Sequence, residues 1–260
     1  MKTGFIGMGS MAAAMLKGMT RFAGFKSEDI CAYAPNQKKL QKNAQLLGFR
    51  PCSSAEEAVS DSECVILACK PYQVESVLAG LGSLLDGKVL ISVAFGWDYE
   101  HFSQYLDTDK VRVQYIVPNT PVSVGEGIVL MEAESGLSPS ERLEWKNILG
   151  RFSKVIELDS SLIPAGSAIA GCAPAFVDVF IESLADGGVK NGIPRETAYE
   201  IIPQMIIGAA KLMQESGLHP GQLKDQVCSP GGTTIRGVAA MEEGGVRSSM
   251  IRAVDAACGK

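Results

Sequence analysis

The sequence predicts an α/β fold of the doubly wound type, followed by an all-helical domain. From Lys2 to about Glu157, short apolar runs alternate with amphipathic stretches of helical period. Several of the runs are continuously apolar, which is typical of parallel strands covered by helices on both faces. After about Asp159 the strand signals stop. We therefore expect a first domain at residues 1–158 and a second at residues 159–260.

The first domain is expected to contain at least five strands, with helices in most of the gaps between them. Those strands are predicted at residues 4–6, 30–33, 65–69, 89–93 and 111–116. In the second domain, breaks rich in glycine and proline separate pieces of helical length, at residues 171–174, 192–194, 217–220 and 229–232.

The longest helical piece, residues 195–215, is apolar over more than one narrow face and therefore requires burial on several sides. A domain of about 100 residues offers limited room for that in a monomer. We expect this half to pack against a second copy of itself, as a homodimer or a higher homo-oligomer. One compact monomeric core is the alternative.

Composition excludes several classes of protein. A net charge of -5 argues against a nucleic-acid partner, because phosphate-binding surfaces usually carry a surplus of Lys and Arg. The seven cysteines form no C-x-x-C pair, which indicates reduced thiols and neither a disulfide framework nor a metal site. Residues 201–210, taken as the most apolar stretch, are about half of the roughly 20 residues that a membrane span requires. We expect a cytoplasmic protein without a signal peptide and without a membrane partner.

A glycine-rich turn directly follows the first expected strand and opens a helical pattern, in the run Gly7-Met8-Gly9-Ser10-Met11-Ala12. Gly7 permits the tight turn, Gly9 lets the backbone approach a pyrophosphate, and Ala12 keeps the helix close to the strand. The phosphates would meet the N–H groups at the positive end of the helix. A merely tight turn is the alternative. We predict a Rossmann-type domain in which the cofactor-binding residues include Gly7, Gly9, Ser10, Met11 and Ala12.

The end of the second expected strand indicates which dinucleotide is bound. NAD sites usually place an acid there, to hold the ribose 2′-hydroxyl. This chain has no acid in that segment, whereas Asn36, Lys38 and Lys39 can meet a 2′-phosphate by hydrogen bond and charge. We predict NADPH, with NADH as the alternative, and equally allow that the two lysines are only solvated residues of the next helix.

The helical half carries a second candidate anion site before its penultimate helical pattern. Ser229-Pro230-Gly231-Gly232-Thr233-Thr234 places two glycines at a helix start, where the free N–H groups of Gly232, Thr233 and Thr234 can hold a carboxylate. An ordinary helix cap made by Ser229 or Thr233 is the alternative.

The stretch from Ser229 to Arg252, SPGGTTIRGVAAMEEGGVRSSMIR, resembles the signature of pyrroline-5-carboxylate reductases. The segments VPNTP at 117–121, KPYQ at 70–73 and HPGQLKD at 219–225 resemble the same family, in the same order over nearly the whole chain. The resemblance implies a Rossmann domain, an intertwined helical dimerisation domain, an NAD(P)H cofactor, and reduction of 1-pyrroline-5-carboxylate to proline.

The resemblance also implies roles for individual residues. It places the substrate carboxylate at Ser229, Gly231, Gly232 and Thr233, and the hydroxyl of Thr234 opposite the ring nitrogen. Three segments would line the nicotinamide side: Lys70-Pro71, Ser92-Val93-Ala94 and Asn119-Thr120-Pro121. Asn119 is also expected to contact the substrate.

The chemistry requires little of a side-chain acid, since an imine nitrogen is basic and can arrive protonated, ready for hydride. Thr234 is therefore the candidate catalytic residue that holds the nitrogen. Lys70 follows an apolar strand and is a second candidate, as a general acid or as a hydrogen-bonding residue of the crevice. His101 and His219 are not expected to act in catalysis.

Some residues depart from the pattern expected of the family, among them Phe95 and Met205, and they put the exact substrate in doubt. A reductase of another cyclic imino acid is therefore one rival. A β-hydroxyacid dehydrogenase is a second and would need a catalytic lysine in the helical half. A non-catalytic relative that only binds dinucleotide is the third.

Overall fold

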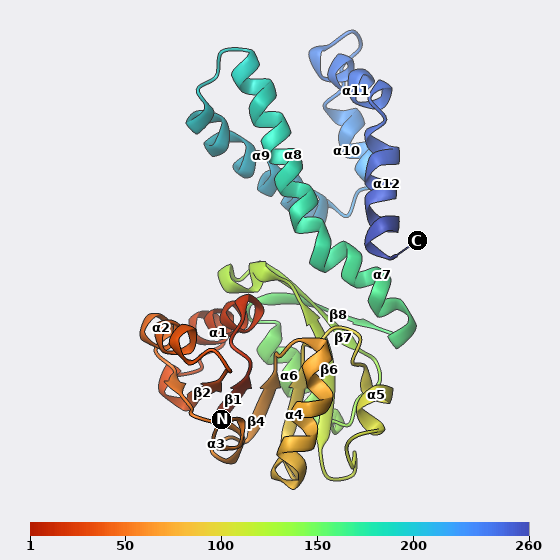
Figure 1. The fold of residues 1–260 in the computed structure, drawn as a ribbon. Helices are drawn as coiled ribbons and strands as arrows, with labels where there is room; N and C mark the ends of the chain where they lie inside the picture. Colours follow the sequence, from red (N-terminus) through yellow and green to blue (C-terminus); the bar gives the residue numbers. More distant parts are fainter. Residues whose placement is uncertain (260) are drawn as a thin grey trace. The chain divides into compact units, whose positions relative to one another are not determined.

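The computed structural model describes residues 1–259, which divide into two compact units (Figure 1). The first unit spans Met1–Gly171, and the second begins at Cys172. The first contains every strand of the described chain, whereas the second contains only helices. The α/β and all-α division expected from the sequence is confirmed.

One sheet forms the centre of the first unit, with its strands in the order β3-β2-β1-β4-β5-β6-β7-β8. Neighbours from β3 to β6 are parallel, β7 is antiparallel to β6, and β8 is parallel to β7. The order 3-2-1-4-5-6 reverses direction between β1 and β4, as in dinucleotide-binding sheets. The bounds are β1 Thr3–Ile6, β2 Ile30–Tyr33, β3 Arg50–Pro51, β4 Cys64–Leu67, β5 Val89–Ser92, β6 Arg112–Pro118, β7 Gly127–Glu132 and β8 Ser153–Leu158.

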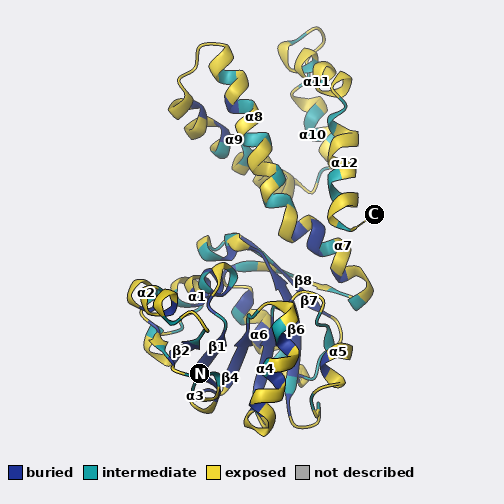
Figure 2. Cartoon of the chain, viewed as in Figure 1, coloured by how far each residue is buried: buried dark blue, intermediate teal, exposed yellow. Residues whose placement is uncertain are grey.

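Helices cover both faces of this sheet (Figure 2). On one face α1, α2 and α6 pack in a cluster that includes Met15 and Trp145, and on the other α3, α4 and α5 pack in a cluster that includes Val59 and Phe102. The central strands between them are therefore mostly apolar. The helices are α1 Ser10–Phe22, α2 Gln37–Leu47, α3 Ala55–Ser60, α4 Val74–Leu81, α5 Tyr99–Ser103, α6 Pro139–Leu149 and α7 Ile163–Ser167.

Short helical turns connect several of these elements. Five are 3₁₀ turns: η1 Ser27–Asp29, η2 Pro71–Gln73, η3 Gly82–Leu85, η4 Thr120–Val124 and η5 Ser160–Leu162. The sixth, η6 Ala168–Cys172, is a π-helical turn. π-helical turns are rare and often occur at functional sites.

The five expected strands are present as β1, β2, β4, β5 and β6, whereas β3, β7 and β8 were not expected. The last strand ends at Leu158, where the sequence predicts the domain boundary, but the first compact unit continues to Gly171. It does so because Ile163 and Ala170 pack with residues of β6 and β7 in one buried cluster.

The second unit has almost no core of its own. Its helices are α8 Ala173–Lys190, α9 Arg195–Ser216, α10 Pro220–Gln226, α11 Thr233–Glu243 and α12 Val246–Ala257. Among its described residues, only Ala185, Ala198 and Ile202 are buried apolar side chains, where α8 packs on α9. Many large apolar side chains are exposed in the single chain, including Ile201, Met205 and Ile251. Figure 2 shows most of these helices in the colour of exposed residues.

One helical stretch of the described chain, Ser160–Lys190, is long and apolar enough to cross a membrane, judged by length and composition alone. Its mean hydropathy is 1.6, and only 17% of the tested window is buried in the single chain. This stretch corrects the expectation from the sequence, which took residues 201–210 as the most apolar part. Pro164 and Pro174 interrupt the apolar run in the sequence without ending the helical path in the structure.

Candidate functional site

The turn between β1 and α1 has the backbone that a glycine-rich dinucleotide loop requires. Gly7 has φ of +97°, and a Cβ there would lie 2.5 Å from the carbonyl oxygen of Ala68. Gly9 precedes α1, and a Cβ there would meet no protein atom within 4 Å, so its open side faces away from the fold. Ala12 is buried against the sheet.

Helix α1 begins with no side-chain cap and with no acidic residue in its first turn. Its first N–H groups and the positive end of its dipole are therefore free to bind an anion. The open side of Gly9 leaves room for that anion next to the backbone. Gly9 and the first turn of α1 can thus hold a pyrophosphate, as a dinucleotide site requires.

A crevice of about 640 Å³ lies around this turn at the carboxyl ends of β1, β2, β4 and β5. It extends across the point where the strand order reverses, where open α/β sheets bind their ligands. Three strand spacings separate β2 from β5, which corresponds to about 14 Å along the sheet edge. The lining includes the whole segment Gly7, Met8, Gly9, Ser10, Met11 and Ala12, together with Asn36, Lys70, Pro71 and Ala94.

At the β2 end of the crevice the chain carries polar and basic side chains and no acid. Asn36 caps α2, and its Oδ1 accepts a hydrogen bond from the backbone N–H of Lys39 at 3.0 Å. Lys38 and Lys39 are exposed in the first turn of α2, and the first turn holds no acid. Lys38, expected to bind the cofactor, is not among the residues that line the crevice, whereas Asn36 is.

At the other end the crevice is walled by segments that follow β4 and β5. Lys70 is exposed, and its backbone N–H donates to Oε1 of Gln73 at 3.2 Å, which stabilises the turn at Pro71. Burial raises the pKa of the Cys69 thiol to about 11, so this sulfur stays protonated at neutral pH. Phe95 also lines this end and is 52% exposed, an unusually open position for a large aromatic side chain.

Asn119 and Thr120 follow β6, and the structure gives them different surroundings. Asn119 is 7% exposed; its Nδ2 donates to the carbonyl of Ala170 at 3.0 Å, and its Oδ1 accepts from the N–H of Ile128 at 2.9 Å. The side chain expected to contact substrate is thus occupied in fixing the π-helical turn η6. Its neighbour Thr120 lines the crevice instead.

In the second unit, Gly232 is the residue that precedes α11, and no side chain caps this helix. The alternative in which Ser229 or Thr233 forms the cap is therefore wrong. Gly231 has φ of +67°, which favours glycine, and a Cβ on Gly232 would lie 3.0 Å from the backbone carbonyl oxygen of Ser229, a close approach. Thr233 and Thr234 are exposed in the first turn, beside free N–H groups.

The two histidines have local partners. Nδ1 of His101 lies 2.7 Å from Oδ1 of Asp98, and Nδ1 of His219 accepts from the N–H of Gly221 at 3.1 Å. Neither lines the crevice. Within residues 1–259, no group of three or more His, Cys, Asp or Glu side chains is placed to hold a metal ion.

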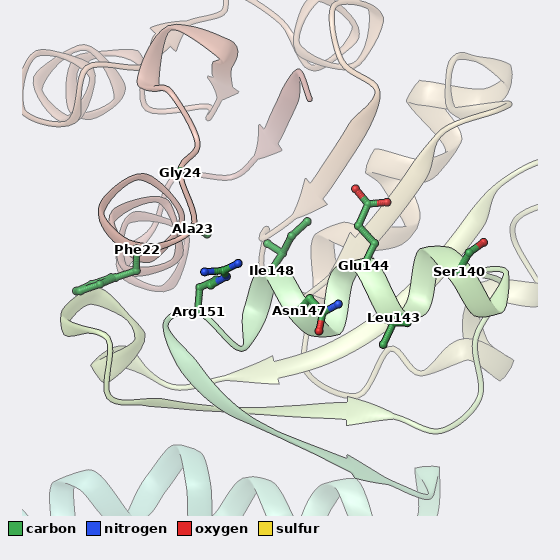
Figure 3. Close-up of a pocket in the computed structure, with 9 residues that line it drawn as sticks. All are labelled: Phe22, Ala23, Gly24, Ser140, Leu143, Glu144, Asn147, Ile148 and Arg151. Atoms are coloured by element: carbon green, nitrogen blue, oxygen red, sulfur yellow. The ribbon is translucent and has the colours of Figure 1, made fainter.

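A second pocket of about 630 Å³ lies between the end of α1 and helix α6, away from the glycine turn (Figure 3). Phe22 and Ile148 line it together with the charged residues Glu144 and Arg151. The two charged side chains point in different directions, and both are exposed. No buried polar group faces this pocket, so the crevice at the strand ends remains the candidate site.

Sequence reasoning missed several residues of the crevice wall, among them Tyr33, Ala68 and Val77. Tyr33 and Ala68 lie at or just beyond the carboxyl ends of β2 and β4, a position that could have indicated them. Val77 comes from α4 and carries no such signal, because only the packing of α4 brings it to the crevice.

The first domain matches a known family of oxidoreductases. Residues 2–96 match the family model described as NADP oxidoreductase, coenzyme F420-dependent. The match covers the glycine turn and the strands that surround the crevice. The chain is thus an oxidoreductase of the two-domain type that binds a nicotinamide dinucleotide in a Rossmann-type domain.

The remainder of the chain identifies the family. Residues 160–260 match the model described as pyrroline-5-carboxylate reductase dimerisation. The pyrroline-5-carboxylate reductase of Treponema pallidum (strain Nichols) is 40% identical over 260 residues, covering 99% of this chain and 98% of the relative. That of Arabidopsis thaliana is 35% identical, covering 98% and 92%. The chain belongs to the pyrroline-5-carboxylate reductase family.

A solved structure supports the same assignment at the level of the fold. The Plasmodium falciparum pyrroline carboxylate reductase, solved with NADP bound, superimposes with a TM-score of 0.88 at 31% identity. The match covers 99% of this chain and 95% of the other. Both the strand order and the helical second half are therefore shared with that protein.

Proposed function

We propose that this protein reduces 1-pyrroline-5-carboxylate to L-proline by transfer of a hydride from NAD(P)H to the C=N bond, as a step of proline biosynthesis. Membership in the family over nearly the full chain is the observation that carries this proposal. The two uncapped helix starts, at α1 and α11, support it, because the cofactor and the substrate are both anions.

The glycine turn would bind the cofactor pyrophosphate through the N–H groups of Ser10, Met11 and Ala12, with Gly7 and Gly9 shaping the turn. The β2 end of the crevice would then take the adenosine ribose, and the β4 and β5 ends the nicotinamide, since the dinucleotide lies across the switch point. Lys70, Pro71 and Ala94 would wall the nicotinamide. When bound, the dinucleotide supplies the hydride.

NADPH is the preferred cofactor in this proposal, with NADH as the alternative. No acid follows β2 to accept a hydrogen bond from a ribose 2′-hydroxyl. The start of α2 instead offers Asn36 and the charges of Lys38 and Lys39 to a 2′-phosphate. Lys38 lies outside the crevice lining, so its role would be electrostatic and would require its flexible side chain to turn toward the phosphate.

The loop before α11 would hold the substrate carboxylate through the N–H groups of Gly231 and Thr233 and the hydroxyl of Ser229. The N–H of Gly232 donates to the carbonyl of Ser229 at 3.0 Å, so Gly232 would shape the loop and not bind the carboxylate directly. The hydroxyl of Thr234 would form a hydrogen bond with the ring nitrogen of the substrate. This bond would keep the iminium oriented while the carbon of its C=N bond accepts the hydride. Lys70 is a second candidate for the hydrogen bond to the ring nitrogen. Since it lines the crevice, it can equally contact the cofactor. Asn119 acts on the site indirectly in this proposal, by fixing the turn η6.

The exposed apolar helices of the second unit would be covered by a second copy of the chain. The match to a dimerisation model over residues 160–260 supports this assignment. It also offers an alternative explanation for the apolar stretch Ser160–Lys190, since a helix buried in a dimer passes the same test as a membrane span. A cytoplasmic location and the absence of membrane and nucleic-acid partners stay predictions.

The proposal is tested by the initial rate of NADPH and NADH oxidation by the purified protein with 1-pyrroline-5-carboxylate, followed by identification of the product. Formation of L-proline is expected, with NADPH used more efficiently. Binding of NADPH without its oxidation by any imino acid would instead indicate a non-catalytic relative.

A reductase of another cyclic imino acid is the second candidate, and the exposed ring of Phe95 at the crevice wall favours it. A large side chain at this point can change the size of ring that fits. The ratio of kcat/KM for the five-membered and six-membered cyclic imino acids separates the two candidates. A higher value for the six-membered ring would replace the first proposal.

A further inference from the structure

Glu132, the last residue of β7, is a buried carboxylate that the reaction described above does not use. It is 0% exposed and forms no ion pair with any residue between 1 and 259. A buried carboxylate without a cation is costly unless hydrogen bonds satisfy its oxygens. Its Oε2 accepts from the backbone N–H of Tyr99 at 2.9 Å, and its Oε1 accepts from Oγ of Ser160 at 2.5 Å.

The bond to Tyr99 connects Glu132 to the crevice. Tyr99 is the first residue of α5 and directly follows the loop of residues 93–98, of which Val93, Ala94 and Phe95 line the crevice beyond β5. Helix α5 has only five residues, and the described contacts pack it on β6 (Figure 1). A helix this short depends on its packing and its terminal hydrogen bonds, so the bond that the N–H of Tyr99 donates to Glu132 fixes the end of the loop.

Two further bonds hold the same loop. The N–H of Gly96 donates to the hydroxyl of Tyr115, a side chain that is 1% exposed, at 3.3 Å. The indole Nε1–H of Trp97 donates to the carbonyl of Pro71 at 3.1 Å. Since Pro71 lies on the wall that follows β4, Trp97 joins the two walls of the crevice.

We infer that Glu132 is a positioning residue for hydride transfer: its carboxylate holds the loop of residues 93–98 in place as the wall of the nicotinamide end. This inference rests on the proposed function, which assigns the nicotinamide to that end. Glu132 does not contact the crevice itself, because Tyr99 and the loop lie between. Its effect is exerted through the placement of Ala94 and Phe95.

The inference predicts a particular set of changes in the variant Glu132→Met, which keeps most of the side-chain volume and removes both acceptors. The value of kcat is expected to fall about 10- to 100-fold, since small misplacements of a reacting group have effects of that order. Affinity for adenosine 2′,5′-bisphosphate, a probe of the β2 end alone, is expected to stay within about twofold. The tryptophan emission, to which Trp97 and Trp145 both contribute, is expected to shift, because the loop that carries Trp97 is released.

Three variants serve as controls. Glu132→Gln keeps an oxygen for Tyr99 and gains an N–H that can donate to Ser160, so it should restore kcat to within a few-fold of the wild type. Ser160→Ala removes only the second bond and should leave kcat nearly unchanged. Glu157 lies on the neighbouring strand β8, and Glu157→Ala removes its ion pairs with Arg142 and Lys146 of α6. This variant reports on loss of stability without a change in the loop.

Wild-type kcat and tryptophan emission in Glu132→Met would overturn the inference, as would an equal loss of kcat in Glu157→Ala. If Glu132→Met does not fold, Glu132→Asp takes its place: the carboxylate is one methylene shorter and is withdrawn from the N–H of Tyr99, so an intermediate kcat is expected and a wild-type value again contradicts the inference. The emission and fragment-binding measurements need no turnover. Inactivity of the wild-type protein would therefore refute the proposed function, while these two measurements still decide on the loop.

Discussion

Asn119 and Thr120 are adjacent in the sequence, yet only the second reaches the crevice. Their pattern predicts a binding segment but cannot separate the two side chains. Asn119 turns inward because the carbonyl of Ala170 and the N–H of Ile128 would otherwise be unpaired in a buried place. Glu132 was missed for a similar reason: an acid at the end of an apolar strand gives no indication of its two partners.

Replacement of Thr234 by Ala tests the residue proposed to hold the ring nitrogen. We expect kcat/KM for the imino acid to fall about 10- to 100-fold, which corresponds to the loss of one hydrogen bond to a charged group. The dissociation constant for NADPH should not change, and Thr234→Ser, which keeps the hydroxyl, should retain most activity. Unchanged turnover in Thr234→Ala would remove this residue from the mechanism.

The ionisation of Glu132 predicts how stability depends on pH. Burial is the largest cause that raises the pKa of Glu132, Asp98 and Glu134 add to it, and the bonds from Ser160 and Tyr99 oppose it. Because the folded pKa lies above the unfolded one, the contribution of this group to stability is full below the unfolded pKa of about 4.3 and is lost as the pH rises through the folded pKa. We expect the free energy of unfolding, measured with denaturant from about pH 4 to pH 7, to fall less with rising pH in Glu132→Gln than in the wild type. Identical pH profiles would contradict this assignment.

At the level of elements, the strands that helices cover on both faces are the ones that the sequence predicts. β1, β4 and β5 are buried at every residue, so their apolar runs are unbroken. β3 has two residues, one of them a proline, and β8 is partly exposed along its length, so neither has a pattern that differs from a loop. β7 is clearly apolar, but its antiparallel pairing to β6 depends on contacts distant in the sequence.

The start of α2 is the element proposed to select NADPH. Replacement of Lys38 by Glu should lower kcat/KM for NADPH about 10- to 100-fold and affect NADH much less, because an acid repels a 2′-phosphate and attracts a 2′-hydroxyl. Lys42→Glu changes the same charge one turn further along α2 and serves as the control. An equal effect of both variants would show that only the general charge of the helix matters.

For the whole molecule, the helical unit has too few buried apolar side chains to be complete as a single chain. The sequence predicts this from the broad apolar face of residues 195–215, although it underestimates the stretch from Ser160 to Lys190. Sedimentation without detergent should give at least twice the mass of the 27.6 kDa chain. Ile201→Glu should weaken the assembly, whereas Leu46→Glu, a matched change in the first unit, should not. A wild-type monomer, or a requirement for detergent, would contradict the dimer.

In the proposed reaction a hydride passes from the dinucleotide to the C=N carbon of the substrate. This transfer is tested by supplying NADPH deuterated on the transferred position at C4 together with 1-pyrroline-5-carboxylate, and by locating the label in the product. We expect L-proline with one deuterium at C5. Proline without the label, or NADPH bound and never oxidised, would contradict it.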